Sequence, residues 1–250
     1  MRYTSDLTDA QWEMIKDYFP VGNKSKYDKR ELVNAVLYLV KTGCQWRNLP
    51  KDFPNWKAIS MFYYRAQKKG IWDEILKMLV KKARKINGRN ENPSYALIDS
   101  QSLKTTSASE KRGYDGEKTK GKKRHIVTDT MENLLCIHVH AANIHDTKGE
   151  VFTFEKALYR YPTIQAGCAD GGYRGTFKNT FEEFHNIRID ISMQIKEQKG
   201  FQVIPKRWIV ERTFSWLNHS RRLSKDYEIK TVYAETMCII SHFHTLLRKF

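Results

Sequence analysis

Apolar residues recur every three or four positions over most of the first 88 residues, and this spacing predicts helices. Thr8 and Gln11 stand three residues apart, as in a capping box, and predict the start of the first helix. Residues 28–42 carry one apolar stripe, and Gly43 is a suitable terminator. A turn-rich connector leads to two more helices, separated by Gly70. The three longer helices are expected over residues 28–42, 56–69 and 72–86.

The pattern changes after residues 87–93, a polar segment that contains Gly and Pro and has no periodicity. Short apolar runs typical of strands follow, the second and third of them as an antiparallel hairpin. Strands are expected over residues 95–98, 124–128, 134–141, 164–169 and 187–193. Helices are expected over residues 146–159, 177–185, 207–227 and 232–249. The chain is therefore predicted to join a small all-α domain, residues 1–88, to an α/β domain with a mixed sheet flanked by helices, residues 92–250.

Within the first domain, two helices joined by a tight connector are compatible with a helix-turn-helix reader of DNA. The second of them, over residues 56–69, carries Lys57, Arg65 and Lys68 as candidate DNA contacts. The alternative is an ordinary solvated helix face.

The charge of the chain favours a polyanionic partner. It has 44 Lys and Arg against 28 Asp and Glu, a formal net charge of +16, and a pI of about 9.6. Such an excess attracts nucleic acid and supplies phosphate contacts. Residues 102–125 form a long basic segment in which Lys122, Lys123 and Arg124 are candidate DNA contacts, unless the segment is merely solvated. We expect double-stranded DNA as the partner.

Cysteine usage and hydropathy indicate the compartment. The four cysteines are far apart, so they indicate neither a zinc ribbon nor a disulfide framework. The chain shows no apolar signal core and no stretch long enough to span a membrane. We therefore expect a cytoplasmic protein associated with the bacterial nucleoid and with no membrane partner.

Three carboxylates suggest metal-dependent chemistry. Asp99 ends an apolar run, Asp170 precedes two glycines, and Glu211 lies within a predicted helix. Mg²⁺ prefers oxygen ligands, and two such ions about 4 Å apart can activate both oxygens of a displacement at a phosphodiester. Alone, the Asp-Gly-Gly segment would indicate only a turn. The intervals of 71 and 41 residues leave room for strands and helices that bring the acids together.

Two other groups of residues have competing interpretations. His138, His140, His145 and Asp146 could suggest zinc, but a polar strand face explains them more simply. Arg207, Glu211, Asn218 and Arg222 share one face of the helix predicted over residues 207–227. That face could bind metal and phosphate, or it could be an ordinary salt-bridged surface.

Several motifs in consistent order resemble the DDE transposases of small bacterial insertion sequences. They cover nearly the whole chain: residues 7–12 (LTDAQW), 43–50 (GCQWRNLP), 97–103 (LIDSQSL), 122–127 (KKRHIV), 141–146 (AANIHD), 169–173 (ADGGY), 208–217 (WIVERTFSWL) and 221–228 (RRLSKDYE).

The resemblance implies a ribonuclease-H-like catalytic fold in which Asp99, Asp170 and Glu211 bind two Mg²⁺ ions, for which Mn²⁺ can substitute. Such enzymes bind the terminal inverted repeats of their element, nick the DNA with water and join the freed 3′-hydroxyl to target DNA. Both ends must be held together, which implies a homodimer on DNA. A catalytically inactive or domesticated DNA-binding protein, or a nuclease on the same fold, is the alternative.

The chain departs from the family's Tyr-Arg-Glu-Lys signature at two positions. Arg207 and Glu211 match it, but Ile204 stands in place of the Tyr and Asn218 in place of the Lys. The interval of 41 residues also leaves no room for the β-rich domain that larger relatives insert, and residues 194–205 are the expected mobile loop. The candidates to replace the two missing DNA contacts are Arg212, Arg221 and Arg222.

Overall fold

The N-terminal region of the computed structural model is helical, as the apolar periodicity predicts. The structure describes residues 2–20, 26–114, 120–144, 146–173, 175–192 and 206–250. The Thr8 hydroxyl accepts a hydrogen bond from the Gln11 N–H, and Gln11 Oε1 accepts one from the Thr8 N–H, so the capping box is confirmed. The helical elements are α1 (Asp9–Ile15), η1 (Lys16–Tyr18), α2 (Lys29–Thr42), η2 (Trp46–Asn48), α3 (Trp56–Lys68) and α4 (Ile71–Ile86).

Gly43 ends α2 for two physical reasons. Its φ of +72° lies in the left-handed region that favours glycine. A side chain at this position would also approach the Arg221 backbone within 3.2 Å, so the end of α2 packs tightly on the C-terminal part of the chain. The connector from α2 to α3 spans residues 43–55, as the expected helix bounds imply, and includes η2, so it is longer than the tight turn of a helix-turn-helix motif.

The sheet begins after residue 94. The strands over residues 95–104 and 120–129 are longer than the apolar runs predict, the strand over residues 134–141 is as predicted, and those over residues 166–170 and 188–192 are shorter. β1 continues past Ile98 through alternating polar residues because it pairs with β3 over its whole length, from Ala96 with Asp129 to Lys104 with Gly121. The hairpin of β3 and β4 is confirmed as antiparallel. The strands are β1 (Tyr95–Lys104), β2 (Gly113–Tyr114), β3 (Lys120–Asp129), β4 (Leu134–Ala141), β5 (Ala166–Asp170) and β6 (Arg188–Ser192).

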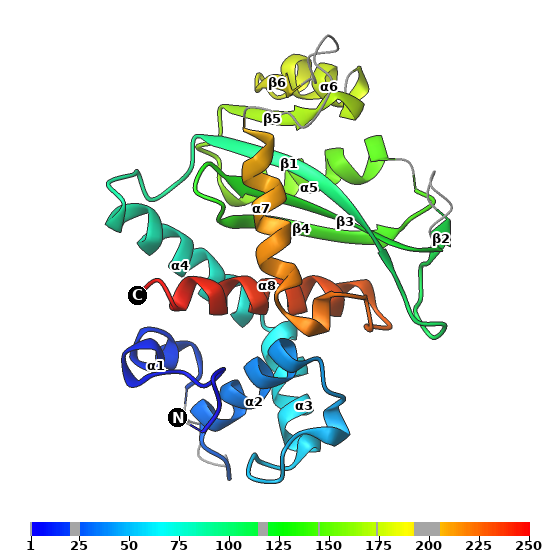
Figure 1. Ribbon diagram of the computed structural model, residues 1–250. Helices are drawn as coiled ribbons and strands as arrows, with labels where there is room; N and C mark the ends of the chain where they lie inside the picture. The colour runs from blue at the N-terminus through cyan, green and yellow to red at the C-terminus, as the bar shows by residue number, and fades with distance from the viewer. Residues whose placement is uncertain (1, 21–25, 115–119, 145, 174, 193–205) are drawn as a thin grey trace.

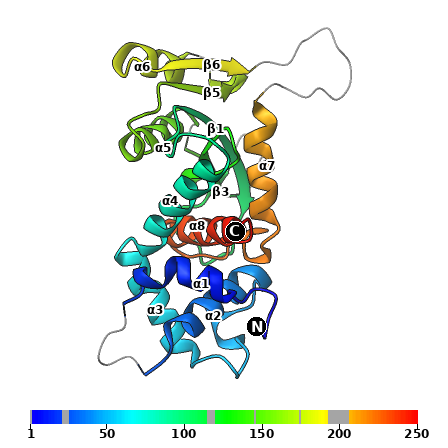
Figure 2. The same cartoon turned by 90° about the vertical axis from the view of Figure 1, so that its left-hand side faces the viewer.

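Helices cover both faces of this mixed sheet. The strand order is β2-β3-β1-β5-β6, with β4 paired to β3, and β5 runs parallel to both β1 and β6. α5 (Asp146–Arg160) packs on β3 and β4, whereas α7 (Arg207–Asn218) packs across β1, β3 and β5 on the other side (Figure 2). α6 (Thr176–Phe184) packs on β6. This is the mixed α/β arrangement that the sequence predicts.

The helix expected over residues 207–227 is wrong beyond Asn218. α7 ends there, and a 3₁₀ turn, η4 (Arg221–Leu223), follows. The helix stops because the chain folds back onto α2 and the last helix, α8 (Thr231–Leu247): the Ser220 and Ser241 hydroxyls are 2.8 Å apart, and Arg222 is buried. Arg222 therefore does not share a helix face with Glu211.

The last helix, α8 (Thr231–Leu247), lies between the sheet and the N-terminal helices (Figure 1). It contacts β4 on one side and α4 and α2 on the other, and the Trp72 and Phe243 rings stack at 5.9 Å. One cluster of buried apolar residues extends from Leu7 to Leu247. The division into domains over residues 1–88 and 92–250 stays a prediction. In the described part of the chain, no helix is long and apolar enough to cross a membrane.

Candidate functional site

Asp99 and Asp170 lie at the same level on adjacent parallel strands. β1 and β5 pair Tyr95 with Ala166 and Leu97 with Cys168, and the same register two residues further aligns Asp99 with Asp170. Both carboxylates also accept a hydrogen bond from a nearby backbone N–H: the Ser100 N–H donates to Asp99 Oδ1 at 2.7 Å, and the Gly172 N–H donates to Asp170 Oδ1 at 2.8 Å. The two carboxylates are thus positioned by the sheet rather than by flexible loops.

The glycines after Asp170 make a sharp exit from the strand, as the sequence suggests. Gly171–Tyr173 form a 3₁₀ turn (η3) directly after β5. A side chain at Gly172 would lie 3.2 Å from Asp170 Oδ1, so glycine leaves room for the carboxylate.

Glu211 approaches the two strand acids from α7. Val210, Phe214 and Leu217 are buried and fix the rotation of this helix on the sheet. Arg207, one turn before Glu211, has its Nε 2.9 Å from Glu211 Oε1 and its Nη1 3.5 Å from Asp170 Oδ2. One guanidinium therefore links the second and third acids of the predicted triad.

The electrostatics of the site are those of a crowded acid cluster. Burial raises the pKa of Asp99 to about 6, and the neighbouring carboxylates Asp170 and Glu211 add to the increase. The Ser100 N–H and the Arg207 guanidinium act in the opposite direction. The site holds three acids around one arginine, an environment that favours an additional cation.

The chemistry of these side chains fits a hard divalent ion, because all three offer carboxylate oxygens. Within the described ranges, however, no three His, Cys, Asp or Glu side chains are already close enough together to hold a metal ion. The Glu211 carboxylate is directed to Arg207 instead. Metal binding by all three acids would therefore need Glu211 to leave Arg207.

A hydrogen-bonded group that the sequence did not indicate lies beside Arg207. The Tyr95 hydroxyl donates to Asp190 Oδ2 at 2.6 Å, and Lys206 Nζ donates to the same oxygen at 3.0 Å. These contacts join the start of α7 to β1 and β6 and so hold Arg207 near the acids. The three residues are 95 and 16 positions apart in the chain, and no local pattern connects them.

Three of the cations predicted to contact DNA are buried, which corrects their expected exposure. Lys122 is fully buried, with its Nζ 3.2 Å from Asp226 Oδ2, and Arg124 is 2% exposed. Arg222 donates to Glu228 Oε1 at 2.6 Å and to the Cys44 carbonyl at 3.2 Å. Because these three side chains are buried inside the protein, DNA could contact them only if the surrounding chain moved.

The other predicted contacts are accessible. Arg207 and Lys123 are half-buried; Arg212 and Arg221 are exposed. Arg212 donates to Glu132 Oε1 at 2.9 Å and lies over the Trp208 ring. Lys57, Arg65 and Lys68 are exposed on α3.

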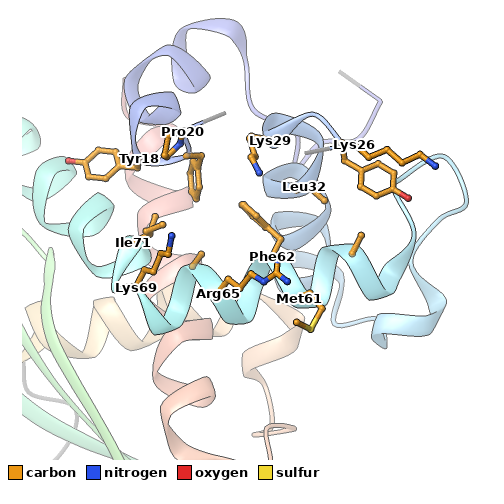
Figure 3. A pocket seen from close by; sticks show the side chains of 14 residues that line it. Tyr18, Pro20, Lys26, Lys29, Leu32, Met61, Phe62, Arg65, Lys69 and Ile71 are labelled. Atoms are coloured by element: carbon orange, nitrogen blue, oxygen red, sulfur yellow. The ribbon is translucent and has the colours of Figure 1, made fainter. Parts of the chain in front are cut away.

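A cavity of about 510 Å³ opens beside α3, between the end of η1 and the start of α2 (Figure 3). Its walls are aromatic and apolar, with Phe62 and Leu32 among them, and Lys29, Arg65 and Lys69 lie around it. The α3 surface is therefore basic on its exposed side. DNA reading by this helix stays a prediction.

Some predictions concern residues that the structure does not describe. Ile204, the loop over residues 194–205 and His145 lie outside the described ranges, as does the Asp146 side chain. Asn218 is the last residue of α7 and is exposed. His138 Nδ1 lies 3.1 Å from Glu235 Oε1, and the His125 and His140 rings stack at 4.7 Å. These contacts tie β4 to α8 and β3 to β4.

Comparison with known proteins identifies the family. A family model described as "Transposase DDE domain" matches residues 91–242, and one described as "Putative transposase of IS4/5 family" matches residues 7–76. The chain is 35% identical over 81 residues to the uncharacterized protein y4sN of Sinorhizobium fredii, covering 31% of this chain and 65% of that protein. It is 24% identical over 117 residues to an uncharacterized 16.2 kDa protein of insertion element IS402 from Burkholderia cepacia, covering 43% of this chain and 78% of that protein. Since the first model spans more than half of its length, the chain belongs to the family of transposases with a DDE domain.

Proposed function

We propose that this chain is the transposase of an insertion sequence. It binds the terminal inverted repeats of the element as a homodimer, cleaves the DNA by two-metal-ion hydrolysis and joins the freed 3′-hydroxyl ends to target DNA. The observation that carries the proposal is the level alignment of Asp99 and Asp170 on parallel strands, with Glu211 facing them from α7.

Asp99, Asp170 and Glu211 would hold the divalent ions, Mg²⁺ or in its place Mn²⁺. When bound, two such ions activate an attacking oxygen and stabilise the departing one at a phosphodiester. The fit rests on the carboxylate oxygens and on the closeness of the acids: burial first, and then the charges of Asp170 and Glu211, raise the pKa of Asp99, and a bound cation favours its charged form.

The protein's own side chains orient the reaction. β1 and β5 keep two carboxylates level, and the packed face of α7 fixes the third. Arg207 balances Asp170 and Glu211 while no cation is bound. Once released from Glu211, its guanidinium can bind a phosphate through two parallel hydrogen bonds.

The distribution of charge supports DNA as the substrate. The net charge of +16 attracts duplex DNA, and the exposed cations on α3 and α7 can release counterions from it. We assign DNA contacts to the accessible members of the predicted set: Lys57, Arg65, Lys68, Lys123, Arg207, Arg212 and Arg221.

The test is cleavage of the DNA that flanks the gene for this chain. With Mg²⁺, duplexes that carry the terminal inverted repeats should acquire nicks that leave 3′-hydroxyl ends, and these ends should then join a target plasmid. Binding without Mg²⁺-dependent cleavage would instead indicate a DNA-binding protein on the same fold. Cleavage without joining would indicate a nuclease.

A further inference from the structure

A second basic surface lies at the C-terminal end of α7, on the same part of the molecule as the acids. It is an open groove of about 580 Å³ between the end of β1 and the connector from α7 to α8. Two lysines, two amides and two hydroxyls provide its polar lining: Lys104, Lys225, Gln101, Asn218, Ser102 and Ser224. Lys104 lies in the basic segment over residues 102–125 that the sequence marks for DNA contact, whereas Lys225 was not among the expected contacts.

The groove and the candidate active site are lined by the same two elements, β1 and α7. Gln101 follows Asp99 by two residues on β1 and so faces the same side of the strand. Asn218 follows Glu211 by seven residues on α7, which returns it to nearly the same helix face about 10 Å further along the axis. A DNA strand that passes over the three acids and continues along this face of α7 would therefore reach the groove next.

The side chains of the groove suit a phosphodiester. Ammonium, amide and hydroxyl groups all donate hydrogen bonds to phosphate oxygens, and no carboxylate is among the described residues that line it. The nearest acid along the chain, Asp226, is 4% exposed and faces inward to Lys122. Gln101 Oε1 is buried and has no hydrogen-bond partner in the described part of the chain.

Backbone contacts hold the two lysines side by side. The Asp226 N–H donates to the Lys104 carbonyl at 3.0 Å, and Thr105 forms a parallel bridge with Asp226. Beneath them, Lys122 Nζ donates to the Glu228 carbonyl at 2.9 Å, and Arg222 pairs with the Glu228 carboxylate. The buried cations thus fix the connector that carries Lys225, and the groove exists before any DNA binds.

We propose that this groove binds the phosphate backbone of the DNA strand next to the cleaved bond, with one phosphate contact from Lys104 and one from Lys225. Asn218 brings no charge to the groove, and these two lysines supply it. The inference rests on the proposed function, because the path of the strand is set by the position of the acids.

The experiment compares two double variants with the same change in net charge. Lys104→Gln/Lys225→Gln removes the groove cations. Lys85→Gln/Lys178→Gln removes two exposed lysines that pair with Glu91 and Glu182 on α4 and α6. Binding of a labelled duplex that carries the element end is measured in EDTA over a range of NaCl concentrations, and thermal unfolding shows that each variant folds.

Two lost phosphate contacts should lower the slope of log affinity against log salt by about 1.8 and weaken binding about 30-fold at 0.15 M salt. The control variant should keep the slope of the wild type. A single uncharged methylphosphonate in place of a phosphate that Lys104 or Lys225 contacts should weaken binding of the wild type. The same replacement should have no further effect on the groove variant, which lacks both lysines.

Equal slopes and affinities for the groove and control variants would overturn the inference. The proposed function fails separately, if the wild type does not nick the element end or if Asp170→Asn nicks it equally well. A groove effect on binding without any nicking would leave the phosphate site intact and reject only the catalysis.

Discussion

Asp99 and Asp170 differ by 71 in residue number, as do all the residues that β1 and β5 pair. The interval between the two acids in the sequence is therefore the register of the two strands. Because this parallel pairing is recorded up to Leu97 and Cys168, two residues before the acids, the register of the strands brings the carboxylates to the same level without help from a loop. This relationship leads to two predictions about the acids.

Asp170→Asn should abolish nicking while leaving the fold intact. The amide oxygen can still accept the Gly172 N–H, but the charge that attracts a divalent ion is lost. We expect a loss of at least about 100-fold in the nicking rate, measured on the element-end duplex with Mg²⁺. Glu183→Gln, an exposed change on α6, serves as the control and should nick like the wild type. Full activity of Asp170→Asn would remove this acid from the site.

Mg²⁺ should stabilise the wild-type protein without DNA. Asp99 is crowded by Asp170 and Glu211, and a bound cation relieves that repulsion only in the folded state. At a free ion concentration roughly 100 times Kd, the free energy of unfolding should rise by about 2.7 kcal/mol. Thermal unfolding with increasing MgCl₂ measures this effect, with matched NaCl for ionic strength. The increase should be absent from Asp170→Asn, and an equal increase in both proteins would contradict a site built on these acids.

The features that the sequence predicted correctly depend on neighbours in the chain. The capping box of Thr8 and Gln11 and the left-handed Gly43 each lie within one helical turn of the structure they specify. The end of α7 at Asn218 has no such signal, because the chain turns there to pack on Ser241 of α8. Local periodicity continues past that point, so it predicted a longer helix.

The same reasoning explains the candidate site. A strand end and a resemblance marked Asp170, and β5 does end there, whereas Asp99, expected to end a strand, lies within β1, which continues to Lys104. Lys122 appeared to be a surface cation in a basic segment, but its partner Asp226 lies 104 positions further along the chain. The sequence shows that a lysine is present at this position, but only the fold shows that it forms an ion pair with Asp226.

Lys122→Met should therefore destabilise the protein rather than weaken its DNA contact directly. The substitution leaves Asp226 buried without the ammonium that lies 3.2 Å away, and removing one partner of a buried pair costs about 3 to 5 kcal/mol. Urea unfolding of the wild type and the variant measures this difference. The double variant Lys122→Met/Asp226→Leu should recover part of it, because no unpaired charge remains.

The buried role of Lys122 would be contradicted if Lys122→Met kept the free energy of unfolding of the wild type but reduced the salt slope for DNA binding. It would mean that Lys122 faces DNA in the complex. A change in urea unfolding thus indicates the buried role of Lys122, and a change in the salt slope of DNA binding indicates a DNA contact.

His242 should make stability depend on pH. On α8 its Nε2 accepts a hydrogen bond from the Leu134 N–H at 3.0 Å, which requires that nitrogen to be unprotonated. Burial lowers the pKa of His242 to about 3, and the nearby charge of Lys249 lowers it further. Between pH 3 and the unfolded value near 6.5, the unfolded chain therefore binds more protons than the folded one. The stabilisation by neutral His242 is complete above pH 6.5 and decreases as pH falls.

His242→Gln tests this dependence, because the glutamine side chain does not titrate. The variant should be less stable than the wild type at pH 7, where a packed ring is lost, but it should lose less stability on acidification. The difference in slope should reach about 1.4 kcal/mol per pH unit below pH 6, measured by urea unfolding at pH 7, 6, 5 and 4. His185→Gln, a partly exposed histidine beside Glu155, should keep the pH dependence of the wild type. Parallel curves for His242→Gln and the wild type would show that α8 and β4 separate before His242 is protonated.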